Sequence, residues 1–362
     1  MGAAARLVLG LGVLTAVRLL LAGATDLIPD EAYYDYWSRS LDVCYWDQPG
    51  GVAAWNALVR AVFGGGVFAV RLGAIVLSLV TSYFAYDLGR VCLGDRMRAA
   101  NGVLLAQILP LLSVGAILML HDALLGACAA MTLAFAARAT IGGRPEWWYA
   151  AGAAFAAAMY AKFSAVLLAP GLLLFLILSP SDRRHLRRRE PYLAGLLAAF
   201  LFSPVIFWNM RHGWIALLAV AKLATKGAAG FLGSVGSLAE FIGSQFGLVI
   251  PIIFVFMLLA ARATWKNRRD EDARGHFFSR VRSWAFSPTS HFNLCGPASR
   301  AIGPRSPICR EVYWRRITSP RAGVMPASAD GVSAEWSSRV SQQLLFTRTR
   351  RSRFSPFRRV RT

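Results

Sequence analysis

The segment from Leu27 to Pro49 places acidic and aromatic side chains between two strongly apolar stretches. Its carboxylates are Asp30, Glu31, Asp35, Asp42 and Asp47, with tyrosines and tryptophans beside them. A carboxylate at a membrane surface can take a proton, orient a polar substrate or bind a cation. Aromatic belts at membrane surfaces use rings and basic residues. The Asp-Glu pair at the point where the chain leaves the apolar stretch therefore needs another explanation.

The composition of the 362-residue chain is that of a polytopic membrane protein. Hydrophobic residues make up 56% of it and the mean hydropathy is +0.46, whereas globular domains hold about 45–50% apolar residues. A helix needs about 20 apolar residues to cross the bilayer core. We therefore predict an all-α bundle with eight membrane spans, at about residues 5–25, 67–88, 99–120, 123–140, 147–163, 164–180, 191–209 and 246–262.

Basic residues predict which ends of these spans face the cytoplasm. Arg6 precedes the first span, and basic loops follow spans two, four, six and eight at residues 90–98, 138–144, 181–190 and 262–269. If all eight spans alternate, every one of these loops falls on the same side, and short basic loops stay cytoplasmic. The expected location is a membrane, with the N-terminus in the cytoplasm.

The same alternation gathers several charged residues at the extracytoplasmic face. They are Asp30 and Glu31, His121 and Asp122 at a turn between two spans, and Lys162 at another turn. Charges at the ends of different spans on one face predict a shared site. His121 and Asp122 suit a divalent metal ion, a candidate cofactor; a structural cap of the following span is the equal alternative. A further set of basic residues falls on this face and also needs an explanation: Arg39, Arg60, Arg71, Arg211, Lys222 and Lys226.

Two amphipathic helices are expected in the first outer loop. The first begins after Pro29, with Asp30 as its cap and Glu31 in its first turn, and its aromatic face carries Tyr33, Tyr36, Trp37 and Leu41. The second follows the DQPGG turn and carries Val52, Trp55, Val59, Val62 and Phe63 on one face. Helices of this kind lie in the membrane interface.

Four segments together resemble the PMT-type membrane glycosyltransferases, which include protein O-mannosyltransferases and the aminoarabinose transferases of lipid A. They are DEAYYDYWSRSLDVCYWDQPGGVAAWNALVRAVFG with the helix after it, HDALLGACAAMTLAFAARAT, GAAFAAAMYAKFSAVLLAPGLLLFLILSP and YLAGLLAAFLFSPVIFWNMRHGW. The resemblance covers about residues 5–262. It implies a GT-C helical bundle that takes a sugar from a polyprenyl-phosphate donor. Transfer to a lipid, glycan or protein acceptor then occurs on the outer face, among membrane lipids.

The resemblance also implies roles for individual residues. Asp30 matches the catalytic acidic position of the family and is the candidate base, while Glu31 beside it orients substrate or holds a metal. Arg71, early in the second span, corresponds to an arginine associated with the donor phosphate, and Lys162 could share that work. Snorkelling to the interface is the alternative for both cations.

Four further residues are candidates for substrate contacts. Asp47 and Gln48 resemble an acidic pair before the second interfacial helix that contacts sugar, and a plain turn is the alternative. Tyr33 and Tyr34 follow the Asp-Glu pair and are candidate substrate-binding residues on the aromatic helix; a mere interfacial belt is the alternative for the rings.

Most of the positive charge lies in the last hundred residues. Residues 1–262 carry 20 basic and 13 acidic residues, whereas residues 263–362 carry 20 and 6, and 19 of those 20 are arginine. We interpret 1–262 as the glycosyltransferase domain and 263–362 as a basic, disordered tail. Two origins of the tail stay open: an out-of-frame reading of a GC-rich gene, or a genuine arm that binds anionic lipid or nucleic acid. The membrane domain itself gives no reason to expect a nucleic-acid partner.

Two competing functions use the same apolar spans. A multi-pass transporter would show inverted repeats and broken helices at the membrane midplane, and the two halves of this sequence do not match. An inactive, truncated remnant of a glycosyltransferase would keep all the motifs and differ only in activity. The sugar and the acceptor are not predicted by the sequence.

Overall fold

The computed structural model describes residues 2–225 and residue 262. Within that part every regular element is a helix, and an isolated bridge pairs Cys44 with Pro49. The predicted all-α class is therefore confirmed. The predicted eighth span, apart from Arg262, and the tail at 263–362 lie outside the described residues.

Four of the described helices are long and apolar enough to cross a membrane. They are α1 (Ala3–Ala22), α4 (Val67–Leu93), α7 (His121–Thr140) and α10 (Glu190–Arg211). Each coincides with a predicted span. With 27 residues, α4 is about 40 Å long at 1.5 Å per residue, so it reaches beyond a hydrocarbon core of about 30 Å. The predicted polytopic membrane architecture is confirmed.

The predicted span at 99–120 is broken into two shorter helices, α5 (Arg96–Ile108) and α6 (Pro110–Gly115). Asp95 begins α5 by accepting hydrogen bonds from the backbone N–H groups of Met97 and Arg98. The break falls at Leu109, which is extended with ψ 137°. Pro110 explains it, because proline disfavours the helical conformation of the residue before it and has no N–H to donate.

A tight turn separates the fifth and sixth spans, as predicted. α8 (Trp147–Ala161) ends at Lys162, which is extended with φ −162° and ψ 137°. A short 3-10 helix, η1 (Phe163–Leu167), then leads into α9 (Leu168–Leu178). A second 3-10 helix, η2 (Arg183–Arg187), precedes α10.

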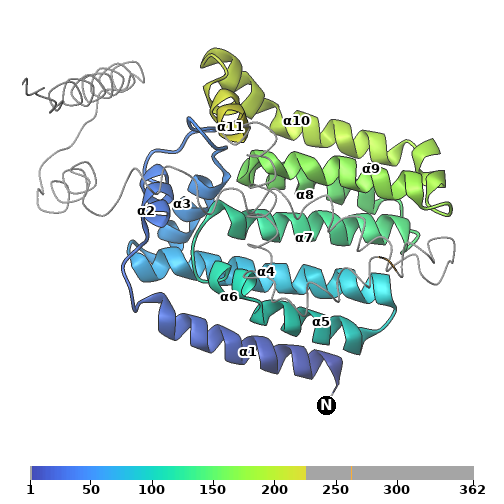
Figure 1. Ribbon diagram of the computed structural model, residues 1–362, viewed down its shortest axis with the longest axis horizontal. Coiled ribbons are helices and arrows are strands. Elements are labelled where there is room, and N and C mark those ends of the chain that lie inside the picture. Colours follow the sequence, from blue (N-terminus) through green and yellow to red (C-terminus); the bar gives the residue numbers. More distant parts are fainter. Residues whose placement is uncertain (1, 226–261, 263–362) are drawn as a thin grey trace, which may run out of the picture. The chain divides into compact units, whose positions relative to one another are not determined.

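The long helices lie side by side in one bundle (Figure 1), in which α4 packs on α5 and α7, and α8 packs on α7 and α10. Small side chains fill the seam between α7 and α8, among them the buried alanines Ala129, Ala134, Ala137, Ala151 and Ala158. Helices in membranes associate through such close backbone approach. Gly152 is one point that requires it, because a Cβ there would come within 2.4 Å of the Ala194 carbonyl oxygen of α10.

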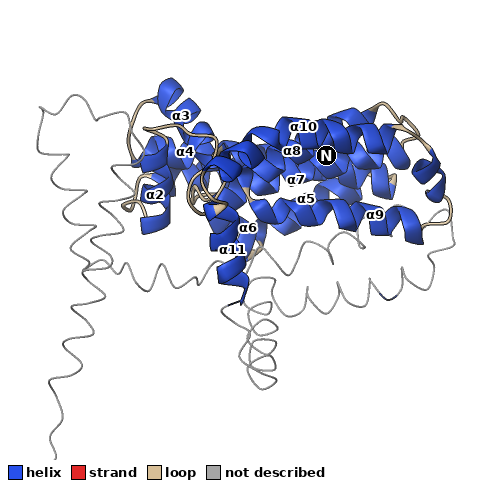
Figure 2. Ribbon diagram, turned by 90° about the horizontal axis from the view of Figure 1, so that it is seen from above, coloured by secondary structure: helices blue, strands red, loops and turns tan. Residues whose placement is uncertain are grey.

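The two ends of the bundle differ in chemistry. At one end lie α2 (Pro29–Trp37) and α3 (Gly51–Phe63), where α7 begins and α8 ends (Figure 1, Figure 2). α11 (Ile215–Thr225) follows α10 at that end. The opposite end carries basic residues, where Arg90 and Arg138 both pair with Asp87. We call the end with α2 and α3 the outer end, following the predicted orientation.

The first outer helix buries a different face from the predicted aromatic one. α2 ends at Trp37, so Leu41 lies beyond it, and Tyr36 is 46% exposed. Its buried residues are Glu31, Tyr34, Asp35 and Trp37. Arginines from other helices form ion pairs with both buried carboxylates. These ion pairs orient the acidic side of α2 toward the bundle, and the hydrophobic pattern of the sequence does not predict them.

The second outer helix follows its predicted face only in part. Val52 and Val59 of α3 are buried, whereas Val62 and Phe63 are 63% and 55% exposed. The buried face also includes Asn56. The apolar pattern predicted the buried face correctly for the first turns of α3. The last turn of the helix extends beyond the helices on which α3 packs, so its apolar residues are exposed.

Candidate active site

The start of α2 is capped by Glu31 and not by Asp30. The helix begins at Pro29, a favourable first position because the missing N–H would have no partner there. The Glu31 carboxylate accepts a hydrogen bond from the backbone N–H of Ile28 at 3.1 Å. Asp30 therefore lies inside the first helical turn with its side chain exposed, and its predicted role as a cap is wrong.

Glu31 and Arg71 form a buried ion pair that joins α2 to α4. Their shortest contact, from Arg71 Nη2 to a Glu31 carboxylate oxygen, is 3.0 Å, with side-chain exposures of 2% and 0%. The other Glu31 oxygen accepts from the Met119 backbone N–H at 3.0 Å. A buried carboxylate must be satisfied in this way, since removal of one partner from such a pair costs about 3–5 kcal/mol.

Arg71 donates from all three of its nitrogens to groups of the protein. Besides Glu31, its guanidinium donates to the carbonyl oxygens of Ala22, Thr25 and Asp26 and to the Thr25 hydroxyl, at 2.8–3.2 Å. A guanidinium has five N–H donors, so these contacts occupy it fully. The donor-phosphate role implied for Arg71 stays a prediction, and it would require breaking these bonds.

A chain of four polar side chains crosses the outer end from α2 to α8. The Tyr34 hydroxyl and His121 Nδ1 share a hydrogen bond of 2.7 Å. His121 Nε2 lies 3.2 Å from Asp122, and the other Asp122 oxygen accepts from Lys162 Nζ at 2.9 Å. Lys162 is 1% exposed, and Asp122 is its acidic partner. The structure thus brings together Tyr34, His121, Asp122 and Lys162, which the sequence places far apart.

His121 and Asp122 do not by themselves complete a metal site. Asp122 already faces the Lys162 ammonium at 2.9 Å, which occupies the position that a cation would need. Among residues 2–225, no group of three or more His, Cys, Asp or Glu side chains could hold a metal ion. The predicted metal ion stays a prediction, and the described residues do not fit it.

A second group of polar side chains joins α2 to the loop before α3. The Tyr33 hydroxyl hydrogen-bonds to the Asp47 carboxylate and also accepts from the Trp46 indole N–H. Burial, together with the neighbouring negative charge of Asp30, raises the pKa of Asp47 to about 6, against the Tyr33 hydrogen bond that lowers it. Burial raises the pKa of the Tyr33 and Tyr34 phenols far above the usual value. Both phenols therefore stay neutral O–H donors.

Asp30 and Asp47 form a pair of carboxylates in unequal surroundings. Asp30 is exposed, but protein atoms shield one side of it, and this desolvation raises the pKa of its carboxyl above the ordinary value. One carboxylate oxygen of Asp47 and the Gln48 amide oxygen are buried without a hydrogen-bond partner among the described residues. Buried acceptors without partners are rare in folded proteins, so these two oxygens can still accept hydrogen bonds from the donor groups of a bound molecule.

Other residues of this loop were not anticipated from the sequence. Trp37 stacks on Tyr45 with ring centroids 4.0 Å apart, and the Tyr45 hydroxyl donates to backbone carbonyls of Trp37 and Ser40. The buried Cys44 accepts from the amide of Asn209 in α10 at 3.7 Å. These contacts hold the loop in place, and no local pattern shows them because Cys44 and Asn209 are 165 residues apart.

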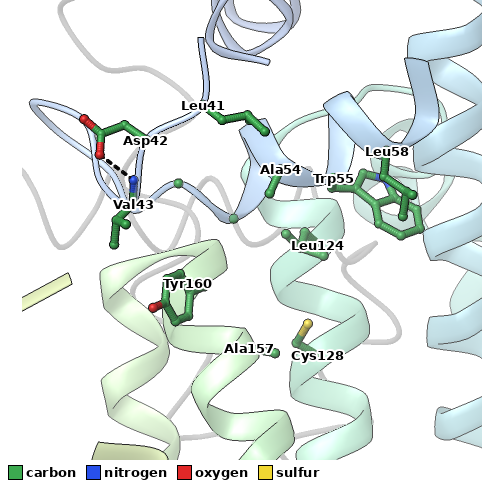
Figure 3. A pocket seen from close by; sticks show the side chains of 12 residues that line it. Leu41, Asp42, Val43, Ala54, Trp55, Leu58, Leu124, Cys128, Ala157 and Tyr160 are labelled. Atoms are coloured by element: carbon green, nitrogen blue, oxygen red, sulfur yellow. Dashed lines mark hydrogen bonds between the residues drawn. The ribbon is translucent and has the colours of Figure 1, made fainter. Parts of the chain in front are cut away.

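An apolar groove of about 720 Å³ lies next to these polar groups (Figure 3). The loop before α3 supplies Leu41, Asp42 and Val43, α3 supplies Ala54, Trp55 and Leu58, α7 supplies Leu124 and Cys128, and α8 supplies Ala157 and Tyr160. Leu124 follows Asp122 by two residues and Tyr160 precedes Lys162 by two. The Lys162–Asp122 pair therefore lies within one helical turn of groove-lining residues on both α7 and α8.

Comparison with known proteins agrees with this fold. Residues 47–208 match the family model described as dolichyl-phosphate-mannose-protein mannosyltransferase. The chain is 26% identical over 261 residues to lipid A galacturonosyltransferase RgtD of Rhizobium johnstonii, an alignment that covers 70% of this chain and 53% of RgtD. The chain therefore spans about half the length of that relative.

Two solved structures have a similar fold. ArnT from Cupriavidus metallidurans bound to undecaprenyl phosphate superposes with a TM-score of 0.56 at 19% identity, over 81% of this chain and 61% of ArnT. The apo state of the same protein gives 0.53 at 17% identity, over 83% and 62%. The resemblance seen in the sequence is confirmed: residues 47–208 match the family model described as dolichyl-phosphate-mannose-protein mannosyltransferase, and the described bundle has the GT-C helical fold of ArnT.

Proposed function

We propose that the chain transfers a sugar from a polyprenyl-phosphate donor to a lipid acceptor at the extracytoplasmic face of the bacterial inner membrane, with its N-terminus in the cytoplasm. The observation that carries the proposal is the meeting of Asp30, Asp47 and the Lys162–Asp122 pair beside an apolar groove at one end of the bundle. The names of RgtD and ArnT support the lipid acceptor and the polyprenyl phosphate.

Asp30 is the proposed base. The acceptor oxygen forms a bond with the anomeric carbon of the sugar, the bond from that carbon to the phosphate oxygen breaks, and polyprenyl phosphate leaves with the electron pair. The acceptor proton moves to the Asp30 carboxylate, which is exposed to an incoming hydroxyl. Partial desolvation raises the pKa of Asp30, which makes it a stronger base than a fully hydrated aspartate.

Asp47 and Gln48 are the proposed sugar contacts. Their buried acceptor atoms without partners suit sugar hydroxyls, which donate hydrogen bonds. Tyr33 holds the Asp47 carboxylate, and Tyr34 holds His121, so both tyrosines position the polar groups around the substrate. Glu31 is assigned to the buried pair with Arg71 and not to the chemistry.

Lys162 is the better candidate for the leaving phosphate, because Arg71 is occupied by protein acceptors. An ammonium has three N–H donors, and the contact to Asp122 uses one of them. The groove-lining residues Leu124 of α7 and Tyr160 of α8 lie within one helical turn of this pair. A polyprenyl chain in the groove would bring its phosphate toward Lys162, and electrostatic stabilisation of such a leaving group is a major part of catalysis.

The proposal is tested by transfer of radiolabelled sugar from a polyprenyl-phosphate donor into the lipid fraction of membranes that contain the full chain. Asp30→Asn keeps the shape of the side chain and removes the base, so transfer falls by about 100-fold or more. Asp26→Asn, four residues earlier in the same loop, is the matched control and leaves transfer within about twofold. Absence of transfer by the unmodified chain contradicts the proposed function. Normal transfer by Asp30→Asn contradicts only the role of the base.

A further inference from the structure

Two arginines of the first outer loop share one buried carboxylate. Arg39 donates to one oxygen of Asp35 at 2.9 Å and Arg60 donates to the other at 2.8 Å. The Asp35 side chain is 7% exposed, whereas those of Arg39 and Arg60 are 55% and 27% exposed. One negative charge therefore holds two positive charges, and the group keeps a net charge of +1 that faces outward.

Most of the donors on these arginines remain outside the contact with Asp35. Each guanidinium has five N–H groups in a planar fork, and the described hydrogen bonds of Arg39 and Arg60 engage one side-chain nitrogen each. Because Asp35 fixes both guanidiniums, their remaining donors are held close together in a defined orientation. Two pre-oriented guanidinium groups match the oxygens of a phosphate, which arginine binds in a bidentate manner.

Exposed apolar residues lie next to the arginines. Phe63 follows Arg60 by three residues, on the same side of α3, and Phe68 lies in the first turn of α4 just beyond it; they are 55% and 48% exposed. Aromatic side chains at this level are typical of the membrane interface. A ligand at the arginines thus meets positive charge at one point and apolar surface beside it, which is the chemistry of a lipid with a phosphate in its headgroup.

The position of the positive charge also needs a cause. Short extracytoplasmic loops of membrane proteins carry few arginines. An ion pair that only joined α2 to α3 would need one arginine for the one aspartate, so the second arginine is not explained by the packing of the two helices. Asp35 lies five residues after Asp30 on α2, about 7.5 Å along the helix axis. The carboxylate that orients the arginines and the proposed base are therefore carried by the same nine-residue helix.

We propose that Arg39 and Arg60 form a docking site for the phosphate of an anionic membrane lipid, the class of lipid that serves as the sugar acceptor. The identification of that lipid as the acceptor rests on the proposed function. The binding of the lipid phosphate by Arg39 and Arg60 does not depend on the proposed function, because it requires no sugar donor and no sugar transfer.

Binding is measured with the full-length chain in detergent micelles by the fluorescence anisotropy of labelled didecanoyl phosphatidic acid. Unlabelled didecanoyl phosphatidic acid, didecanoyl phosphatidylcholine and inorganic phosphate are the competitors. The test variant is Arg39→Gln/Arg60→Gln. The matched control is Arg98→Gln/Arg144→Gln, which removes two exposed, acid-paired arginines at the opposite end of the bundle.

The test variant weakens binding of phosphatidic acid by about tenfold or more, since it removes charge-assisted hydrogen bonds from two guanidiniums. The control changes it by less than about twofold, and phosphatidylcholine competes poorly. Arg39→Lys/Arg60→Lys keeps both positive charges but loses the planar guanidinium groups, so its affinity for phosphatidic acid lies between those of the unmodified chain and the glutamine double variant. If the glutamine double variant does not fold, the exposed Arg39→Gln alone replaces it, with an expected loss of about threefold.

Equal loss in the test and control variants, or equal competition by phosphatidylcholine, overturns the docking site. Competition by inorganic phosphate at the same concentration as phosphatidic acid shows a simple anion site and also overturns it. Absence of transfer by every chain, with lipid binding intact, would contradict the proposed function while the docking site stands.

Discussion

The buried pair of Glu31 and Arg71 gives the sharpest prediction about how the outer end is held together. Arg71→Met removes the cation and leaves the Glu31 carboxylate, which is 0% exposed, with only the backbone N–H groups of Ile28 and Met119. A buried charge left without its partner costs about 3–5 kcal/mol. We therefore expect Arg71→Met to lower the free energy of unfolding by that amount.

The opposite substitution is milder. Glu31→Gln keeps the size of the side chain, and Arg71 keeps the carbonyl oxygens of Ala22, Thr25 and Asp26 as acceptors. The loss is about 1.5–3 kcal/mol, the value of a hydrogen bond to a charged group. In the double variant Glu31→Gln/Arg71→Met neither charge remains, so its loss is smaller than the sum of the single losses by about 2 kcal/mol.

The assay is unfolding of the purified chain by sodium dodecyl sulfate in mixed micelles, followed by circular dichroism. Donor KM is measured on the same proteins. Arg144→Gln, which removes an exposed ion pair with Glu146, is the control and leaves the unfolding curve unchanged. The reasoning is refuted if Arg71→Met unfolds like the unmodified chain and raises only donor KM, because Arg71 would then serve the donor phosphate and not the fold.

Three further outcomes follow from the geometry. The pKa of Asp47 is about 6, against an ordinary value of 3.8, so its contribution to stability is complete below about pH 4 and is lost as the pH rises through 6. Asp47→Asn removes this pH dependence. Between pH 4 and 7.5 the unfolding free energy of the variant therefore rises relative to that of the unmodified chain, by at most about 3 kcal/mol. Asp122→Asn leaves the buried Lys162 with a neutral acceptor and lowers the unfolding free energy by about 1–2 kcal/mol in the same detergent titration, whereas an unchanged curve would show that Asp122 does not stabilise Lys162. In a cysteine-free background, Ser40→Cys reacts with an impermeant thiol reagent in intact cells and Arg188→Cys does not; labelling at 188 would reverse the predicted orientation.

The spans were largely predictable because hydropathy is a local property of the chain. The helices α1, α4, α7 and α10 lie where apolar runs of the sequence predicted membrane spans. Pro110 also carried a local signal for the break between α5 and α6, which the prediction of one span at 99–120 passed over. Reading the preference of residues before proline would have found it.

The composition of the site was predictable to the same degree. Asp30, Glu31, His121, Asp122 and Lys162 were placed at one end from span alternation alone, and the structure places them at that end. The exchange of roles between Asp30 and Glu31 at the start of α2 was not predicted. Both residues suit the first turn of a helix, and only the position of Ile28 and the presence of Arg71 decide which carboxylate turns inward.

The sequence by itself therefore determined the positions of α1, α4, α7 and α10 and the end of the bundle at which the charged residues gather. Only the tertiary structure decided which distant charges are partners: Arg71 with Glu31, Arg60 with Asp35, and Lys162 with Asp122. The physical reason is distance along the chain. Apolar runs act within one helix, whereas Glu31 meets Arg71, and Asp122 meets Lys162, 40 residues away in each case, and only helix packing brings such groups within hydrogen-bonding reach.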